Sequence, residues 1–484
     1  MKKLIFIILV LCICAKVFSQ TYFNNNYDYN QEVNSATSLI NNDSSGFMIA
    51  AHIITTDYHA LNLININDIG DTILSKIYYT DSLDVFYAGI SGAIIKTVDT
   101  CYMLAGSFEI DSSTTTQYGD GILLKIDQDG DTLWSRKYGG VYFDAFRMCR
   151  QTNDGGFIAV GEKDKYNNGW SDMWLVKTDS LGNMEWEKTY GEVSKFESAL
   201  AVEQTHDEGY IISGTKGYLN YNHYIIKTDS LGNQQWFKYF NTGNDDGSCY
   251  IVQSLDSGFI ITGGIVITGM SKQGCIRKLD KNGNQVWLKN YGDITYDFLD
   301  TRAVELDDGS IVVAGTSIYP VERGWLIKVS SNGDLLWDRT YFFDTLRPCY
   351  FYDLVKAQDN GFAMCAWTQT DHGQDAWVVK VDEDGCEYVN CEVGLSNPVY
   401  IENLELLMYP NPASETINFE TNYNGNYNNT KLIISDMLGR IIKEYNVDKS
   451  ILTINSNDLQ NGIYYAFIVV DKVVVNKQKF AILK

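Results

Sequence analysis

Short apolar runs separated by polar turns recur along the chain up to residue 391. In one of them, residues 174–177 end in Lys and lead into the segment Asp-Ser-Leu-Gly-Asn-Met-Glu-Trp at 179–186. Equivalent segments occupy 127–134, 229–236, 280–287 and 330–337, the last with Ser in place of the first Asp. Runs this short, rich in β-branched and aromatic residues, favour strands over helices. Each copy predicts a strand, a tight turn and a second strand that carries the Trp.

A second pattern sets the number of repeats. A polar glycine turn is followed by an apolar strand whose aromatic position falls at 47, 102, 157, 210, 259, 310 (a Ser) and 362, a spacing of 49 to 55 residues. A further short run, such as 145–150 or 198–204, precedes this turn. Four short antiparallel strands in each of seven repeats predict a seven-bladed β-propeller. One such sheet cannot bury both of its faces, so the sheets must stack and the ring must close.

The turn residues and the Trp have physical roles in this prediction. Asp can hydrogen bond to its own turn backbone, and Gly tolerates the positive φ that a tight connection requires. The Trp is expected to pack between adjacent sheets. The first repeat has Leu74 in place of the Trp, and the last repeat has no Trp after its turn at 382–385. We therefore expect residues 21–23 near the N-terminus to supply the outer strand of the last sheet and hide two sheet edges.

The composition changes after residue 391. Three of the five prolines, Pro398, Pro410 and Pro412, follow it, and the repeat stops. We predict a linker at 392–404 and a small immunoglobulin-like β-sandwich at 405–484. Its expected strands are 416–419, 431–436, 441–445, 452–454, 462–470 and 473–482. The predicted fold is therefore all-β, with the propeller spanning 20–391.

The N-terminal segment has the pattern of a secretory signal. Lys2 and Lys3 precede an apolar run at 4–14, and Val17 and Ser19 suit cleavage before Gln20. Residues 1–19 are thus the predicted signal peptide, and Ile13 before Cys14 argues against a lipoprotein signal. No later run approaches the roughly 18 apolar residues of a transmembrane segment.

The C-terminal segment resembles the type A sorting domain of the type IX secretion system. The resemblance covers residues 402–484 and rests on four motifs: Tyr-Pro-Asn-Pro-Ala-Ser at 409–414, Ile-Ser-Asp-Met-Leu-Gly-Arg at 434–440, Leu-Gln-Asn-Gly-Ile-Tyr-Tyr at 459–465, and the end Lys-Phe-Ala-Ile-Leu-Lys. It implies transport by the type IX machinery to the cell surface or the extracellular space. The motif residues are Tyr409, Pro410, Asn411, Pro412, Gly439, Arg440, Gly462, Tyr464 and Lys484. An ordinary adhesive module is the alternative interpretation.

The repeats resemble those of secreted bacterial β-propeller proteins and, more distantly, quinoprotein-type blades, which share a turn Gly followed by Trp. Quinone-dependent enzymes also need a ligand set inside the ring, and no such set is identifiable in the sequence. The resemblance therefore supports the fold and implies no dehydrogenase activity or cofactor.

The net charge indicates which partners to exclude, and the cysteine positions indicate where a disulfide is expected. The formal charge is −23, and loss of the Lys-containing signal makes it more negative. Such a balance argues against nucleic acid, whose phosphates require clustered cations. Most cysteines lie inside apolar strands, but Cys386 and Cys391 are close in sequence, and we predict a disulfide between them after export.

Candidate catalytic and metal-binding groups are few. The five histidines, His52, His59, His206, His223 and His372, have no metal-binding spacing, and no G-x-S-x-G motif is present. Asp127, Asp129 and Asp131 do not follow the order of an EF-hand loop. Acids recur before the first strands at Asp144, Glu197, Asp246 and Asp300, where we expect a scaffold role. The sequence assigns no catalytic residue, metal site or cofactor.

Loop residues that depart from the repeat are better candidates for ligand binding. The connections between second and third strands contain Tyr166, Trp170, Tyr218, Tyr221, Tyr319, Trp367 and His372. Aromatic side chains there could stack on sugars or peptides, or pack at the rim. The leading hypothesis is a non-enzymatic binding or adhesion module for extracellular glycan or protein. A secreted polysaccharide hydrolase or lyase with its site in the funnel, and a structural surface component, are the alternatives.

Overall fold

A computed structural model describes two parts of the chain, residues 21–387 and 406–484. Short gaps within them fall at 31, 56–58, 79–83, 90, 111–117, 166–169, 193, 219, 267–271, 293–296, 319–320, 345–346, 422–429, 437–440, 448 and 471–472. The predicted signal peptide and linker lie outside the described residues. The described parts contain strands and one short 3-10 helix, η1 (Ser456–Asp458).

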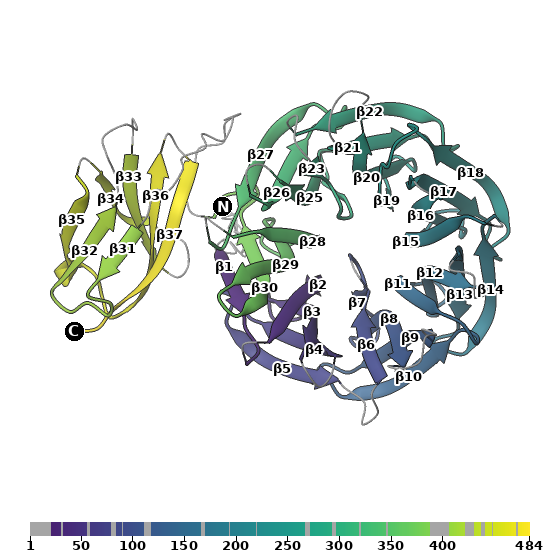
Figure 1. Cartoon of the computed structure of the whole chain (residues 1–484), viewed down its shortest axis with the longest axis horizontal. Helices are drawn as coiled ribbons and strands as arrows, with labels where there is room; N and C mark the ends of the chain where they lie inside the picture. The colour runs from purple at the N-terminus through teal and green to yellow at the C-terminus, as the bar shows by residue number, and fades with distance from the viewer. Residues whose placement is uncertain are drawn as a thin grey trace, which may run out of the picture.

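The strands up to β30 form seven antiparallel sheets within the described residues, arranged around a ring (Figure 1). Sheets 1 to 3 are consecutive in the chain and have the following strands. Sheet 1 has β2 (Val33–Asn41), β3 (Phe47–Ile54), β4 (His59–Ile66) and β5 (Thr72–Tyr78); sheet 2 has β6 (Asp84–Ala88), β7 (Ile94–Lys96), β8 (Tyr102–Ile110), β9 (Tyr118–Ile126) and β10 (Thr132–Tyr138); sheet 3 has β11 (Asp144–Gln151), β12 (Phe157–Asp164), β13 (Ser171–Thr178) and β14 (Met184–Tyr190).

Sheets 4 to 7 continue the same order. Sheet 4 has β15 (Phe196–Gln204), β16 (Tyr210–Gly217), β17 (Asn222–Thr228) and β18 (Gln234–Phe240); sheet 5 has β19 (Cys249–Gln253), β20 (Phe259–Val266), β21 (Lys272–Leu279) and β22 (Gln285–Tyr291). Sheet 6 has β23 (Asp297–Phe298), β24 (Val304–Glu305), β25 (Ile311–Ser317), β26 (Arg323–Val329) and β27 (Leu335–Tyr341); sheet 7 has β28 (Cys349–Lys356), β29 (Phe362–Thr370), β30 (Gly373–Val381) and, as its outer strand, β1 (Phe23–Tyr27).

Where an outer strand carries a Trp, that Trp packs against the next sheet, as the sequence predicts. Trp134, Trp186 and Trp236 lie edge-on to Phe157, Tyr210 and Phe259, with ring centroids 5.9 to 6.2 Å apart. The same Trp covers the turn of that sheet: a Cβ on Gly182 would lie 2.6 Å from Trp134. Gly182 also has a φ of +78°, so both sterics and backbone conformation require glycine there.

The last residue of most outer strands adds a hydrogen bond to the same turn. The Tyr hydroxyl donates to the turn-Gly carbonyl of the next sheet from Tyr138 to Gly182 (2.6 Å), Tyr190 to Gly232 (2.6 Å), Tyr291 to Gly333 (2.7 Å) and Tyr341 to Gly385 (2.7 Å). These outer strands therefore contact the neighbouring sheet through one aromatic ring and one hydrogen bond.

The recurrent Lys of the third strands is buried and forms an ion pair with the Asp of the turn between the first and second strands. Lys177 binds Asp154 (2.9 Å), Lys227 binds Asp207 (2.9 Å), and Lys380 binds Asp359 (2.8 Å). Each Lys side chain is at most 5% exposed, so removing its partner would leave a buried charge. The recurrent Lys and Asp thus stabilise the fold of these sheets.

The structure corrects one aromatic position. Ile311, rather than Ser310, takes the place of the aromatic residue in sheet 6, because Leu306 and Ser310 are bonded across the turn as Thr152 and Gly156 are in sheet 3. Ile311 is 1% exposed and lies in one apolar cluster with Trp287 of the preceding sheet. The turn has the usual length, and the aromatic position follows it one residue later than the sequence pattern suggested.

The N-terminal segment closes the ring, but its strand covers residues 23–27 rather than the expected 21–23. Strand β1 pairs with β30, from Phe23 opposite Lys380 to Tyr27 opposite Ala376. Phe23 takes the place of the Trp, 6.3 Å from Phe47 of sheet 1, and Tyr27 donates to the Gly70 carbonyl (2.8 Å). Only the final residue of the expected segment 21–23 therefore lies in the strand.

The remaining strands form two antiparallel sheets with a common apolar core. One contains β31 (Leu406–Tyr409), β32 (Thr416–Thr421) and β35 (Ile451–Asn455); the other contains β34 (Ile441–Asn446), β33 (Thr430–Asp436), β36 (Gly462–Val470) and β37 (Val473–Ile482). Phe419, Leu432, Tyr464 and Phe480 pack between them. The six expected strands are present, and β31 is an additional one.

Replacing Tyr27 by Phe tests the closing contact. Loss of the hydrogen bond to Gly70 should reduce the free energy of unfolding by about 1 kcal/mol. Tyr190→Phe should cost a similar amount, and Tyr239→Phe, at an outward position that is 37% exposed, should have little effect in the same chemical denaturation experiment. An unchanged free energy of unfolding in Tyr27→Phe would contradict the closing contact described above.

Candidate binding site

One face of the ring collects the connections between second and third strands and those between successive sheets. In a four-stranded antiparallel sheet both kinds of connection lie at the same end. Contacts between them agree: Arg347, before β28, pairs with Asp371 between β29 and β30, and the Gly247 amide donates to the Tyr221 carbonyl (3.0 Å). We call this the loop face. Of the ligand candidates from the sequence, Trp170, Tyr218, Tyr221 and His372 lie in these connections.

Two of the candidate aromatics lie together. The rings of Trp170 and Tyr218 are 5.2 Å apart at 31°, although they come from the connections of sheets 3 and 4. Tyr218 is 59% exposed. Tyr221 lies against Phe196 instead, with ring centroids 5.5 Å apart. Neighbouring sheets thus build one aromatic pair, with Tyr218 exposed and Trp170 half-buried, that no single repeat contains.

The other candidates are separate from this pair. Trp367 is half-buried in β29, opposite Tyr350, and His372 is exposed in the turn before β30. Tyr166 and Tyr319 lie outside the described residues. The seven candidates therefore do not form one cluster.

A second aromatic group lies at the mouth of the ring on the loop face, and the sequence did not single it out. The rings of Tyr350 and Tyr352 in β28 are 5.2 Å apart, and the Tyr350 hydroxyl donates to the Asp300 carboxylate (2.8 Å). Burial raises the pKa of Asp300. The sequence signal for this group was the aromatic run Tyr-Phe-Tyr at 350–352 in the innermost strand of sheet 7.

Asp300 differs in position from the other recurrent acids. Asp144, Glu197 and Asp246 accept backbone hydrogen bonds from Gly140 (2.7 Å), Glu192 (3.2 Å) and Val266 (2.9 Å), respectively. These contacts give the three acids the expected scaffold role. In sheet 6 the corresponding strand begins at Asp297, and Asp300 lies three residues deeper, in the break between β23 and β24. Asp297 therefore takes the repeat position of these acids in sheet 6, and the scaffold role expected for Asp300 stays a prediction.

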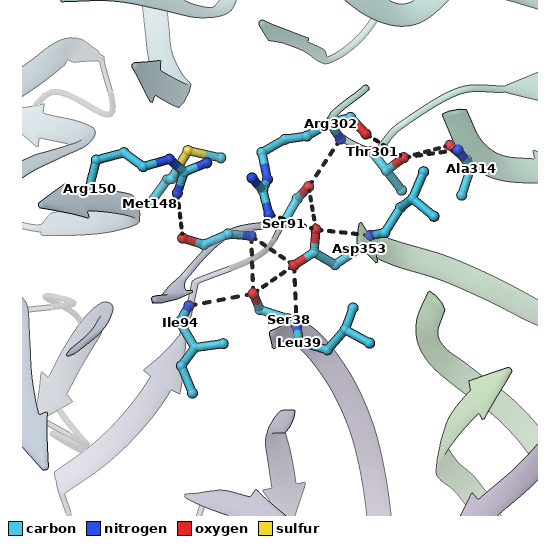
Figure 2. Close-up of polar contacts among 12 residues, drawn as sticks. Ser38, Leu39, Ser91, Ile94, Met148, Arg150, Thr301, Arg302, Ala314 and Asp353 are labelled. Atoms are coloured by element: carbon cyan, nitrogen blue, oxygen red, sulfur yellow. Dashed lines mark hydrogen bonds and ion pairs between the residues drawn. The ribbon is translucent and has the colours of Figure 1, made fainter. Parts of the chain in front are cut away.

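The centre of the ring is occupied by a polar network around Asp353 (Figure 2). The fully buried Asp353 carboxylate accepts hydrogen bonds from the Ser38 hydroxyl (2.8 Å) and from the backbone amides of Leu39 (3.2 Å) and Gly92 (3.0 Å). Ser91 and Arg302 donate to its other oxygen at 3.3 and 3.4 Å. Residues from sheets 1, 2, 6 and 7 meet on this one side chain.

Two interrupted inner strands bring these donors together. The break between β6 and β7 contains Ser91 and Gly92, whose φ angles are +45° and +95°, and the break between β23 and β24 contains Arg302. Arg150 of β11 donates to the Gly92 carbonyl (3.2 Å) and binds Glu203 of β15 (3.0 Å). The network therefore connects sheets across the ring in addition to the contacts around it.

No metal-binding group of three or more His, Cys, Asp or Glu residues occurs in the described parts of the chain. Among the same residues, no helix is long and apolar enough to cross a membrane. Cys386 is disulfide-bonded, and its predicted partner Cys391 lies outside the described residues.

The described C-terminal motif residues converge on the end of β37. The Asn411 side chain accepts from the Ala481 amide (2.9 Å), Gly462 pairs with Ile482, and Lys484 donates to the Asn457 carbonyl (3.1 Å). The Tyr464 ring stacks on Phe480 at 5.6 Å, and Tyr409 donates to Glu420 (2.9 Å). Pro410 and Pro412 flank Asn411, and both follow cis peptide bonds. Gly439 and Arg440 lie outside the described residues.

Comparison with protein families identifies this C-terminal unit. The family model of the secretion system C-terminal sorting domain matches residues 407–482, which we call the sorting tail. The resemblance found in the sequence is thereby confirmed, and the tail indicates export by the type IX system to the cell surface or the extracellular space. No curated protein matches the chain.

Several solved structures are similar at low identity. PorZ, a surface component of the type IX secretion system of Porphyromonas gingivalis, is 11% identical, with 93% of this chain and 70% of that chain covered and a TM-score of 0.32. The β-propeller domain of the Trilobed protease from Pyrococcus furiosus is 9% identical, with 78% and 100% covered and a TM-score of 0.40. An ulvan lyase of polysaccharide lyase family PL25 is 10% identical, with 74% and 96% covered and a TM-score of 0.46.

Replacing Asp353 by Ala tests the central network. The change leaves several buried donors and the Arg302 guanidinium without their acceptor, so the free energy of unfolding should fall by about 3–5 kcal/mol. Asp371→Ala, which removes an exposed ion pair with Arg347, should change it by less than about 1 kcal/mol. Thermal and urea unfolding of the two variants measure the difference, and equal losses would contradict a central structural role.

Asp144→Asn should stabilise the protein at neutral pH. Burial raises the pKa of Asp144 to about 6, against a smaller opposing effect of Lys163, so its ionised form destabilises the folded state above that pH. The variant should gain about 1–3 kcal/mol at pH 7, and its advantage should shrink as the pH falls towards 4, where the wild-type carboxyl is protonated in the folded state.

The exposed turn residue Asp179 provides a control of opposite sign. Hydrogen bonds from the side chain and backbone of Asn183 lower the pKa of Asp179, so its charge stabilises the folded state above the ordinary carboxyl pKa. Asp179→Asn should be less stable than wild type at pH 7, and this difference should narrow as the pH falls below 4. Parallel pH profiles for the two variants would contradict the assigned causes.

Proposed function

We propose that this chain is a secreted seven-bladed β-propeller that binds extracellular glycan or protein through its loop face, without catalysis. The seven sheets of the ring are its blades, and the sorting tail is a small immunoglobulin-like sandwich used for export. The proposed division is a signal peptide at 1–19, the propeller at 20–391, a linker at 392–404 and the sorting domain at 405–484.

The Trp170–Tyr218 pair is the observation that carries this proposal. Large aromatic rings on a water-exposed face offer flat apolar surfaces on which sugar rings or peptide side chains can stack. The pair joins two neighbouring sheets, so the rigid ring fixes its geometry before a ligand arrives. Trp367, Tyr350 and Tyr352 of sheet 7 form a second aromatic group near the mouth of the ring, separate from this pair.

The burial and hydrogen bonding of Asp353 at the centre of the ring favour binding over catalysis. Asp353 is inaccessible, and both of its oxygens are already bonded to protein donors. A general acid or base must reach the proton that it transfers, and a nucleophilic carboxylate must reach the reacting carbon. The central network therefore suits the stability of the ring better than chemistry on a polysaccharide.

Asp300 and Tyr350 are the observation that favours the alternative, a polysaccharide hydrolase or lyase. A half-buried carboxyl with a raised pKa and a hydrogen-bonded phenol beside it can exchange protons with a substrate. In that case the substrate would enter the mouth of the ring from the loop face, and Tyr350 would contact it first.

A binding and depletion experiment separates these functions. The full chain without residues 1–19 is applied to a glycan array and incubated with polysaccharides, and soluble products are analysed by mass spectrometry. We expect binding without new products. The double variant Trp170→Ala/Tyr218→Ala should weaken binding about tenfold through loss of stacking.

Phe237→Ala is the matched control, because Phe237 is 53% exposed on the outer strand of sheet 4 and away from the loop face. It should retain wild-type affinity. Equal binding by the double variant would overturn the assignment of the site. New oligosaccharides that disappear in Tyr350→Phe would establish the enzymatic alternative, and absence of any ligand would favour a structural surface component.

A further inference from the structure

The residue midway between the Trp and Tyr positions of each outer strand provides a third contact between neighbouring sheets. This position is basic in sheets 1 to 6: Lys76, Arg136, Lys188, Lys238, Lys289 and Arg339. Each side chain extends over the turn of the next sheet, where Lys76 binds Asp131, Lys188 donates to Asn233 (3.2 Å) and Lys289 binds Asp334 (3.4 Å). The long aliphatic portions also cover the turn glycines.

The closing strand lacks this contact. Asn25 takes the basic position in β1, between Phe23 and Tyr27, which preserve the other two contacts. Its amide donates to the Gly70 carbonyl (3.3 Å), but it is short and carries no charge. Asp71, in the turn of sheet 1, occupies the place of Asp131 and Asp334 in later sheets. We call this junction of β1 with the 67–71 turn the closure seam.

The sorting tail lies against the closure seam (Figure 1). The Tyr465 hydroxyl of β36 donates to the Asn25 side-chain oxygen (3.2 Å), and Tyr465 is only 6% exposed. Lys479 of β37 has its ammonium nitrogen 5.9 Å from the centre of the Tyr465 ring. A cavity of about 540 Å³ is bounded by Asn25 and Asp71 on one side and by Tyr465 and Lys479 on the other.

The charges around Tyr465 are consistent with its position at the closure seam. Burial, followed by the nearby carboxylates Asp71 and Glu387, raises the pKa of Tyr465 to about 12. A neutral phenol thus lies beside the acidic turn, and the Lys479 cation lies across the cavity from Asp71. The tail brings to the seam the two properties that Asn25 lacks, side-chain length and positive charge.

We propose that the closure seam is a docking surface for the chain's own sorting tail, and that Tyr465 and Lys479 replace the basic contact missing from β1. The tail then has a second role besides directing export. It holds the closure seam together while it is attached, and the seam becomes the weakest junction when the tail leaves. This inference does not depend on what the loop face binds.

Hydrogen exchange of the full chain tests the docking. In Tyr465→Ala/Lys479→Ala, amides of β1 should exchange at least fivefold faster than in wild type, while those of β14, in a seam with its own Lys188, should be unchanged. Lys431→Ala, which removes an exposed pair with Glu444 elsewhere in the tail, is the control and should leave β1 unchanged. Protection of β33 shows whether the tail itself remains folded.

A rescue variant distinguishes docking from general loss of structure. Asn25→Lys restores the residue type of the other sheets and should return β1 to wild-type protection in the Tyr465→Ala/Lys479→Ala background. Asp71→Asn, which leaves the tail sequence intact, should increase exchange of β36 near Tyr465. Unchanged β1 exchange in the tail variant, or failure of Asn25→Lys to restore it while β33 is protected, would overturn the proposal.

Discussion

The contact between each outer strand and the turn of the next sheet is the interaction on which the rest of the ring depends. A single four-stranded sheet of this chain has two apolar faces and cannot bury either of them alone. The Trp that lies on the next sheet's glycine turn buries a large aromatic surface, and the following Tyr fixes the spacing by one hydrogen bond. Because each sheet needs a neighbour on both sides, a chain of such sheets is stable only as a closed ring.

Closure explains both ends of the repeat region. The last sheet receives its outer strand from the N-terminal segment, so the chain termini of the ring meet in one sheet and no edge is left at that position. The substitution of Phe23 for Trp preserves the aromatic contact, whereas Asn25 gives up the cation. This weaker junction coincides with the place where Tyr465 of the sorting tail reaches the ring. The missing basic residue at Asn25 thus explains why the sorting tail contacts the ring at this junction.

The centre and the face of the ring have different chemistry. At the centre, Asp353 gathers donors from four sheets and is fully buried, which favours rigidity over reactivity. On the loop face, aromatic rings from neighbouring sheets remain partly exposed, supported by a framework that gives them fixed positions. An acidic, exported ring with such a face suits recognition outside the cell, and it makes Asp300 with Tyr350 the place where catalysis would have to be sought.

The sequence by itself determined the all-β repeat, the packing role of the Trp, the need for a strand from the N-terminus and the export tail. These features are local or periodic, so residue type and spacing are enough to specify them. Only the tertiary structure decided which residues meet across sheets: Trp170 with Tyr218, Asp300 with Tyr350, and Asp353 with Ser38, Gly92 and Arg302. The same holds for the one-residue shift to Ile311 and the start of β1 at Phe23. Such contacts depend on turn lengths, strand breaks and ring curvature, and no periodic pattern in one chain encodes which side chains those features bring together.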